Sequence, residues 1–169
     1  MKKIYLLMAM MFLAVVSYSQ LLTFEFSALA GSEVTANSNT NATGVLSSVI
    51  SRGTGVAAAA NGGRFNSTGW TMTSSIDPDD YVEFTITPDA GYTLNITDIV
   101  VLHQRSGTGP MNFVMRTSLD AYAADATNIF AGTDVTTTQN ATFTFTSAIN
   151  TTSAVTIRLY AYSAEAAGG

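Results

Sequence analysis

The side chains best suited to ligand chemistry are concentrated between positions 103 and 122. Arg105 precedes a glycine- and proline-containing segment at 106–110, and Arg116 and Asp120 follow that segment. Guanidinium and carboxylate groups hydrogen-bond sugar hydroxyls and carboxylates, so these three residues are a candidate ligand site. The alternative is a structural ion pair that holds a loop in place. The sequence leaves both interpretations open.

Three aromatic side chains are further candidates for binding a sugar ring. Trp70 is the only tryptophan, and its indole either stacks on a ligand or closes one end of the core. Tyr160 and Tyr162 are two residues apart, so they share one face of an extended strand. That face is either an aromatic strip for a glycan or a packing surface.

Three carboxylates that lie close together in the sequence are weak candidates for calcium. Asp77, Asp79 and Asp80 offer the oxygen ligands that this hard cation takes. Their spacing does not match the Asp-x-Asp-x-Asp-Gly loop of calcium-binding proteins. The alternative is a turn, held by side-chain to backbone hydrogen bonds, that precedes a strand. We predict no other cofactor.

Groups that could perform catalysis are sparse. His103 is the only histidine, the chain has no cysteine, and both lysines lie in its first three residues. A thiol nucleophile is therefore excluded, and no Gly-x-Ser-x-Gly elbow is present for a serine nucleophile. Glu83 and Asp120 remain as a possible acid pair for glycoside hydrolysis, but nothing in their spacing marks them out. We therefore predict that the chain is not an enzyme.

Residues 1–19 have the features of a secretory signal peptide. Two lysines precede an apolar run over residues 4–16, and serines stand at the −3 and −1 positions before Gln20. A membrane-spanning helix needs about 20 apolar residues, which is more than this run supplies. We expect a helical leader that is cleaved, and a mature protein that is secreted or held at the cell surface.

Removal of this leader leaves residues 20–169, the length of one domain with a full core. This segment carries five arginines against twelve acidic residues, which argues against nucleic acid or an anionic membrane as a partner. Threonine accounts for 25 of the 169 residues, and threonine favours strands. The composition predicts an extracellular, all-β domain without disulfides.

Alternating apolar and polar residues predict several strands. The clearest is 81–87, in which Val82, Phe84 and Ile86 share one face. The last is 155–162, in which Val155, Ile157, Leu159 and Ala161 share one face. Further strand candidates are 22–26, 45–50, 92–96 and 141–146. Strands of this kind predict an antiparallel β-sandwich.

The segment that contains Arg105 and Arg116 is predicted to form a hairpin. The continuous apolar run 99–102 predicts a strand that is covered on both faces. A five-residue connection to 111–117 predicts that the two strands pair with each other, with His103 opposite Phe113. In this register Arg116 lies near apolar surface and needs an anion, for which Asp120 and Glu83 are candidates.

Several segments together resemble a module of secreted multidomain proteins of Bacteroidota and some cyanobacteria, which often end in a type IX secretion sorting tail. The matching segments are 24–26, 65–70, 80–88, 90–94, 105–110, 116–120 and 157–160. The module resembles a jelly-roll β-sandwich akin to carbohydrate-binding and galactose-binding-like domains. The resemblance assigns no biochemical role and no catalytic residues.

The resemblance also implies one more strand after Gly169 and further domains. Residues 20–169 would then be a single domain that lacks its last strand, with an unpaired edge beside 22–26 that is prone to aggregate. These observations predict a secreted, non-catalytic module that binds polysaccharide or another cell-surface ligand. The alternatives are a structural or adhesive spacer without a small ligand and a fragment of an extracellular hydrolase.

Overall fold

The computed structural model describes residues 20–126, 130–131 and 137–168. The predicted signal-peptide helix at 1–19 lies outside the described residues. Among the residues that are described, no helix is long and apolar enough to cross a membrane.

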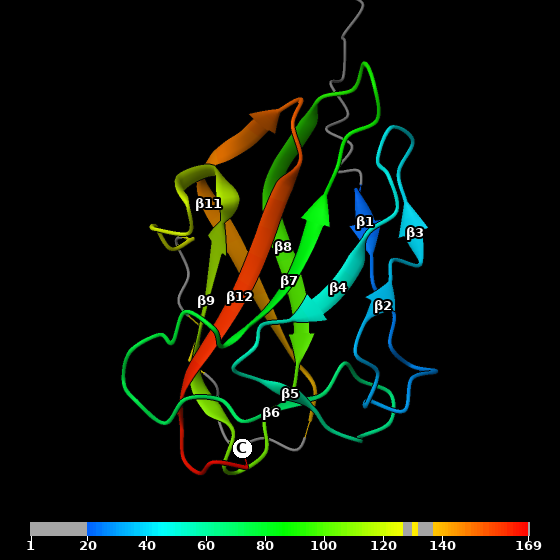
Figure 1. Cartoon of the computed structure of the whole chain (residues 1–169). Helices are drawn as coiled ribbons and strands as arrows, with labels where there is room; N and C mark the ends of the chain where they lie inside the picture. Colours follow the sequence, from blue (N-terminus) through cyan, green and yellow to red (C-terminus); the bar gives the residue numbers. More distant parts are fainter. Residues whose placement is uncertain (1–19, 127–129, 132–136, 169) are drawn as a thin grey trace, which may run out of the picture.

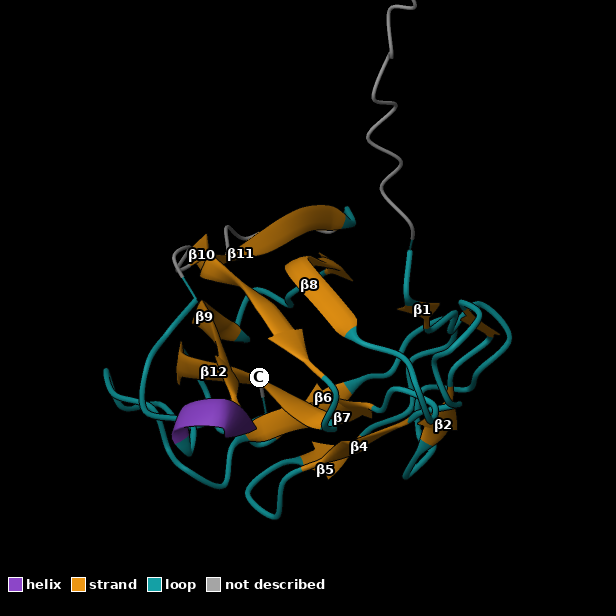
Figure 2. Cartoon of the chain, turned by 90° about the horizontal axis from the view of Figure 1, so that it is seen from above, coloured by secondary structure: helices purple, strands orange, loops and turns teal. Residues whose placement is uncertain are grey.

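The fold is an antiparallel β-sandwich, as predicted (Figure 1). One sheet has six strands in the order β10-β9-β12-β7-β4-β2, and the other pairs β8 with β11. The strands of the larger sheet are β2 (Ala36–Asn37), β4 (Val49–Arg52), β7 (Tyr81–Ile86), β9 (Pro110–Thr117), β10 (Phe130–Ala131) and β12 (Val155–Ala164). Those of the smaller sheet are β8 (Leu94–His103) and β11 (Gln139–Thr151). Figure 2 shows the two layers from above, with β8 and β11 over the larger sheet.

Two short strand pairs and one helical turn complete the described elements. The pairs are β1 (Leu22–Thr23) with β3 (Thr40–Asn41) and β5 (Ala57–Ala58) with β6 (Ser67–Thr68). The turn is the 3-10 helix η1 (Ser118–Asp120), which follows β9. From β7 to β9 the chain crosses from the larger sheet to the smaller and back.

The alternating patterns of β7 and β12 correctly predict which side chains enter the core. Val155 and Ile157 have no exposed surface, and Ile86 is 2% exposed. Strand β12 pairs with β7 on one side and with β9 on the other, which makes it a central strand of the larger sheet. Burying its apolar face is therefore a main source of the sandwich's stability.

The prediction that 99–102 is covered on both faces is wrong. This run belongs to the longer strand β8, whose Val100 and Leu102 are 60% and 69% exposed. The reason is that the β8–β11 sheet is an outer layer, so only alternate residues such as Val101 point toward the larger sheet.

The predicted pairing of 99–102 with 111–117 is also wrong. Strand β8 pairs with β11, whereas β9 pairs with β12 and β10. The segment that carries the glycines and Pro110 therefore crosses between the sheets instead of closing a hairpin. His103 and Phe113 still meet, with ring centroids 5.1 Å apart, but they do so across the sandwich interior.

The predicted first strand at 22–26 is shorter in the structure. Only Leu22–Thr23 forms a strand, and within the described residues it pairs on one side only, with β3. Phe24 and Phe26 follow as loop residues, and Phe24 packs edge-on against Phe84 of β7 at 5.4 Å. The N-terminal segment thus adds aromatic side chains beside the core rather than a long strand.

Candidate functional site

A row of charged side chains crosses the outer face of the larger sheet. Glu83 on β7, Arg158 on β12 and Arg116 on β9 are neighbours in strand register. The Arg158 Nε donates to Glu83 Oε2 at 2.8 Å. The alternation of β12 places Arg158 opposite to the buried Ile157, so the sequence pattern already assigned it to the outer face.

Two tyrosine rings enclose the Arg158 guanidinium. Its central carbon lies 3.9 Å from the centroid of the Tyr81 ring and 4.0 Å from that of Tyr122. Burial opposes the positive charge, but hydrogen bonds to Tyr160 and Glu83 outweigh burial and raise the pKa of Arg158 above its usual value. Arg158 therefore stays charged in a largely aromatic setting, which suits a cation–π arrangement.

The loop after η1 positions Tyr122. The carboxylate of Asp120 accepts hydrogen bonds from the backbone N–H groups of Ala123 and Ala124 at 3.3 and 2.9 Å. The backbone of Tyr122 is left-handed, with φ of 62°. Asp120 therefore shapes this loop. The sequence had made Asp120 a candidate to neutralise Arg116, and in the structure it does not do so.

Arg116 is neutralised by a residue further along the same loop. Its Nε donates to Asp125 Oδ1 at 2.5 Å, and its Nη1 donates to the Tyr122 carbonyl at 3.1 Å. The side chains of Arg116 and Arg158 are 23% and 22% exposed, so solvent reaches both. We call the following six residues the arginine–tyrosine cluster: Tyr81, Glu83, Arg116, Tyr122, Arg158 and Tyr160.

The structure separates Arg105 from this cluster. Arg105 precedes β9 and Arg116 lies near its end, so roughly 20 Å of strand, from Pro110 to Arg116, lies between them. The Arg105 side chain is 2% exposed, and its Nη2 donates to Glu165 Oε2 at 2.5 Å. Arg105, Arg116 and Asp120 therefore do not form one site, and each has a separate set of partners.

The predicted aromatic candidates differ in how accessible they are. Trp70 is 8% exposed, belongs to the core, and donates from Nε1 to the Ser67 carbonyl at 3.3 Å. Tyr160 is 3% exposed, although it lies on the outer face of β12. Tyr162 is half-buried. Trp70 thus has the packing role that was the alternative to a sugar platform.

The three aspartates that were weak calcium candidates form a turn. The backbone N–H of Asp79 donates to Asp77 Oδ1 at 3.0 Å, and Asp80 Oδ2 accepts from the Thr71 N–H at 2.6 Å. Burial raises the pKa of Asp80, and the bond from Thr71 offsets part of that shift. In the described part of the chain, no group of three or more histidine, cysteine or acidic residues could hold a metal ion.

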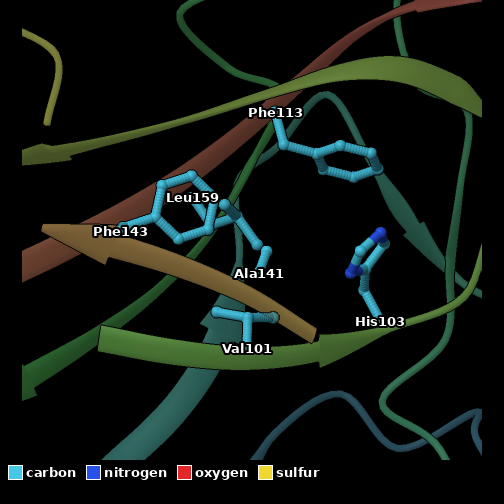
Figure 3. A pocket seen from close by; sticks show the side chains of 6 residues that line it. All are labelled: Val101, His103, Phe113, Ala141, Phe143 and Leu159. Atoms are coloured by element: carbon cyan, nitrogen blue, oxygen red, sulfur yellow. The ribbon is translucent and has the colours of Figure 1, made fainter. Parts of the chain in front are cut away.

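A small apolar cavity lies between the two sheets (Figure 3). Its lining residues are Val101, His103, Phe113, Ala141, Phe143 and Leu159. Burial lowers the pKa of His103, so the imidazole is neutral at physiological pH. The cavity therefore presents one polar ring among apolar side chains.

The two acids of the possible hydrolase pair each have hydrogen-bond partners within the chain. The Glu83 carboxylate accepts from Arg158, and the Asp120 carboxylate accepts from backbone N–H groups of its own loop. Both carboxylates thus have structural partners.

Fold and site together define an antiparallel β-sandwich with a partly exposed arginine–tyrosine cluster on its larger sheet. Comparison with protein-family models, with curated proteins and with solved structures finds no match to this chain. The function is therefore argued from the geometry.

Proposed function

We propose that this chain is a secreted, non-catalytic β-sandwich module that binds carbohydrate through the arginine–tyrosine cluster. The observation that carries the proposal is the Arg158 guanidinium, stacked between Tyr81 and Tyr122 while remaining 22% exposed as a side chain. The predicted leader at 1–19 and the resemblance to secreted jelly-roll modules support an extracellular role within a larger protein.

The chemistry of the cluster fits a polyol ligand. Arg116, Arg158 and Glu83 supply hydrogen-bond donors and acceptors that are fixed by partners, and fixed groups lose little entropy when a ligand binds. Tyrosine rings supply apolar surface with a polar tip. The acidic balance of residues 20–169 disfavours polyanionic partners, so the expected ligand is a neutral polysaccharide or cell-surface glycan.

A structural spacer is the second candidate, and a specific observation favours it. Arg105 pairs with Glu165, Arg116 with Asp125 and Arg158 with Glu83. Three arginines are thus already neutralised by the chain itself. A module of this kind could hold neighbouring domains apart without any small ligand.

Affinity electrophoresis through gels that contain neutral polysaccharides, together with a glycan array, distinguishes the two candidates. We expect the protein to be retarded by at least one polysaccharide. Tyr122→Ala and Arg158→Gln should abolish that retardation. Arg64→Gln is the matched control, because the Arg64 guanidinium bonds to Asn61 in a loop away from the cluster.

The variants must be shown to be folded by their thermal melting transitions. Tyr122 lies in a loop outside the sheet, so Tyr122→Ala leaves the strands in place. This variant therefore tests the site even if Arg158→Gln lowers the stability of the sheet. Absence of retardation on every glycan, with all proteins folded, contradicts carbohydrate binding and favours the spacer. Retardation that survives both substitutions contradicts the assignment of the site.

A further inference from the structure

The loop that carries Tyr122 has an unusual backbone. In the part of the chain that the structure describes, three residues other than glycine have a positive φ, and two of them are the adjacent Ala121 and Tyr122, at 57° and 62°. This left-handed region is unfavourable for a residue with a Cβ atom, which approaches the following carbonyl oxygen. Such strain persists only where the surrounding structure enforces it, and it is concentrated at functional sites. The position of Tyr122 is therefore enforced by its surroundings.

Hydrogen bonds fix the start of this loop to the larger sheet. Figure 2 shows η1 next to β12, on the side away from β8 and β11. The Ser118 Oγ accepts from the backbone N–H of Thr156, on β12, at 3.0 Å. The Tyr122 N–H donates to the Thr117 carbonyl at 2.9 Å, and the Tyr122 carbonyl accepts from Arg116 Nη1 at 3.1 Å. The backbone of Tyr122 is thus bonded through both its N–H and its carbonyl to the end of β9.

Asp120 supplies the hydrogen bonds that close the loop. It lies directly before the two left-handed residues. Its carboxylate accepts from the N–H groups of Ala123 and Ala124, which lie directly after them, at 3.3 and 2.9 Å. A carboxylate is a stronger acceptor for a backbone N–H than a neutral oxygen is. Asp120 therefore bridges the strained pair and offsets its conformational cost.

The loop is what brings the Tyr122 ring to Arg158. Tyr81 belongs to β7 and is paired in register with Tyr160 of β12, so the sheet itself fixes its position. Tyr122 reaches the same guanidinium, at 4.0 Å, from the loop. An ordered loop loses little further entropy when a ligand binds, whereas a loose loop must be ordered at that moment. The conformation of this loop should therefore influence the affinity of the site.

We propose that Asp120 is a positioning residue of the carbohydrate site, which holds Tyr122 against Arg158 without itself touching the ligand. The proposal rests on the carbohydrate binding proposed above. It gives Asp120 a role different from the direct ligand contact for which the sequence had made it a candidate. Both of its carboxylate oxygens are bonded within the loop, and this observation favours positioning over direct contact.

The first measurement needs no ligand. A proton above an aromatic ring resonates upfield in NMR, so the Arg158 Nε–H signal reports whether Tyr122 is in place. Its bond to Glu83 protects this proton from exchange, and Arg158→Gln identifies the signal by removing it. Tyr122→Ala should move the signal downfield, and Asp120→Ala should move it at least half as far. The control Asp98→Ala removes an exposed carboxylate from β8, in the smaller sheet, and should leave the signal unchanged.

The second measurement is the affinity for a polysaccharide that retards the native protein. Asp120→Ala should weaken binding by about tenfold, the cost of ordering a side chain when the ligand binds. Adding Ala121→Gly should restore most of the affinity and return the Arg158 signal toward its native position, because glycine adopts the left-handed conformation at no steric cost. Such a rescue is not expected if Asp120 touches the ligand. Asp98→Ala should bind as the native protein does, and thermal melting shows whether each variant is folded.

Three outcomes overturn the positioning role, and each differs from a failure of carbohydrate binding. The first is an Arg158 signal that moves in Tyr122→Ala but not in Asp120→Ala. The second is unchanged affinity in Asp120→Ala when Tyr122→Ala abolishes binding. The third is a loss of affinity in Asp120→Ala that Ala121→Gly does not restore, which would make Asp120 a direct ligand contact. Absence of binding by the native protein instead overturns the carbohydrate function, and the Arg158 signal still decides whether Asp120 holds Tyr122 in place.

Discussion

The rings of His103 and Phe113 lie 5.1 Å apart and join the two sheets of the sandwich. His103 is the last residue of β8, and Phe113 faces it from β9. The imidazole is half-buried, and burial lowers its pKa from the usual 6.5. The contact therefore couples the packing of the two layers to the protonation of one side chain.

This coupling predicts how stability depends on pH. The unfolded chain takes up a proton on His103 near pH 6.5, whereas the folded chain resists protonation until lower pH. The stabilisation is therefore complete above pH 6.5 and is lost as the pH falls toward the folded-state pKa. Urea unfolding at pH 7.5 and 5.5 measures this loss, and His103→Gln should reduce it. If the two proteins lose equal stability between these pH values, His103 is not responsible.

The pair of Arg105 and Glu165 should be more important for stability than the pair of Arg116 and Asp125. The Arg105 side chain is 2% exposed and that of Arg116 is 23% exposed. Glu165→Gln removes the negative charge that is bonded to this buried guanidinium and should lower the free energy of unfolding by about 1–3 kcal/mol. Asp125→Asn, the matched change at the exposed pair, should cost less than about 1 kcal/mol. Chemical denaturation of both variants tests the order, and equal losses would contradict it.

Two leucines of β8 provide a matched test of the sandwich. Leu94 is 2% exposed at one end of the strand, and Leu102 is 69% exposed near the other. Leu94→Ala creates a cavity and should cost about 2–5 kcal/mol. Leu102→Ala removes the same atoms from solvent-exposed surface and should change stability by less than about 0.5 kcal/mol. Comparable losses at both positions, measured by denaturant unfolding, would mean that Leu102 is also covered.

Gly55 is required by the position of the Asp80 carboxylate. A methyl group at Gly55 would collide with Asp80 Oδ1, and Asp80 is 4% exposed and bonded to the Thr71 N–H at 2.6 Å. Gly55→Ala should therefore lower the free energy of unfolding by about 1–3 kcal/mol. Gly107→Ala is the control, because a methyl group there meets no atom within 4 Å. A thermal melting transition that is unchanged by Gly55→Ala would show that Asp80 moves without cost.

The sequence predicts the fold class and the core strands because burial imposes a short-range pattern. Val82, Phe84 and Ile86 alternate with polar residues, and so do Val155, Ile157 and Leu159, and both sets point inward as predicted. Such alternation depends only on the two-residue repeat of a strand. The pattern can therefore be recognised in the sequence without knowing which strands are neighbours.

Strand pairing could not be derived in the same way. The segment between His103 and Pro110 is short enough for a hairpin, yet it crosses between sheets, because β8 finds its partner in β11 and β9 in β12. The partners of Arg116 and Arg105 depend on this pairing. Asp125 and Glu165 could not be predicted as ion-pair partners, because strand pairing and loop geometry place them beside Arg116 and Arg105. By contrast, the alternation did predict that Arg158 and Tyr160 share one face of the strand.

The double pairing of β12 has a mechanical consequence when the two ends of the described chain are pulled apart. Figure 1 shows the described chain entering near the top of the sandwich and leaving at the bottom, directly after β12. The hydrogen bonds that join β12 to β7 and to β9 run at right angles to the strand. A pull along the strand loads those bonds together in shear. Strand β12 therefore resists being drawn out of the sheet.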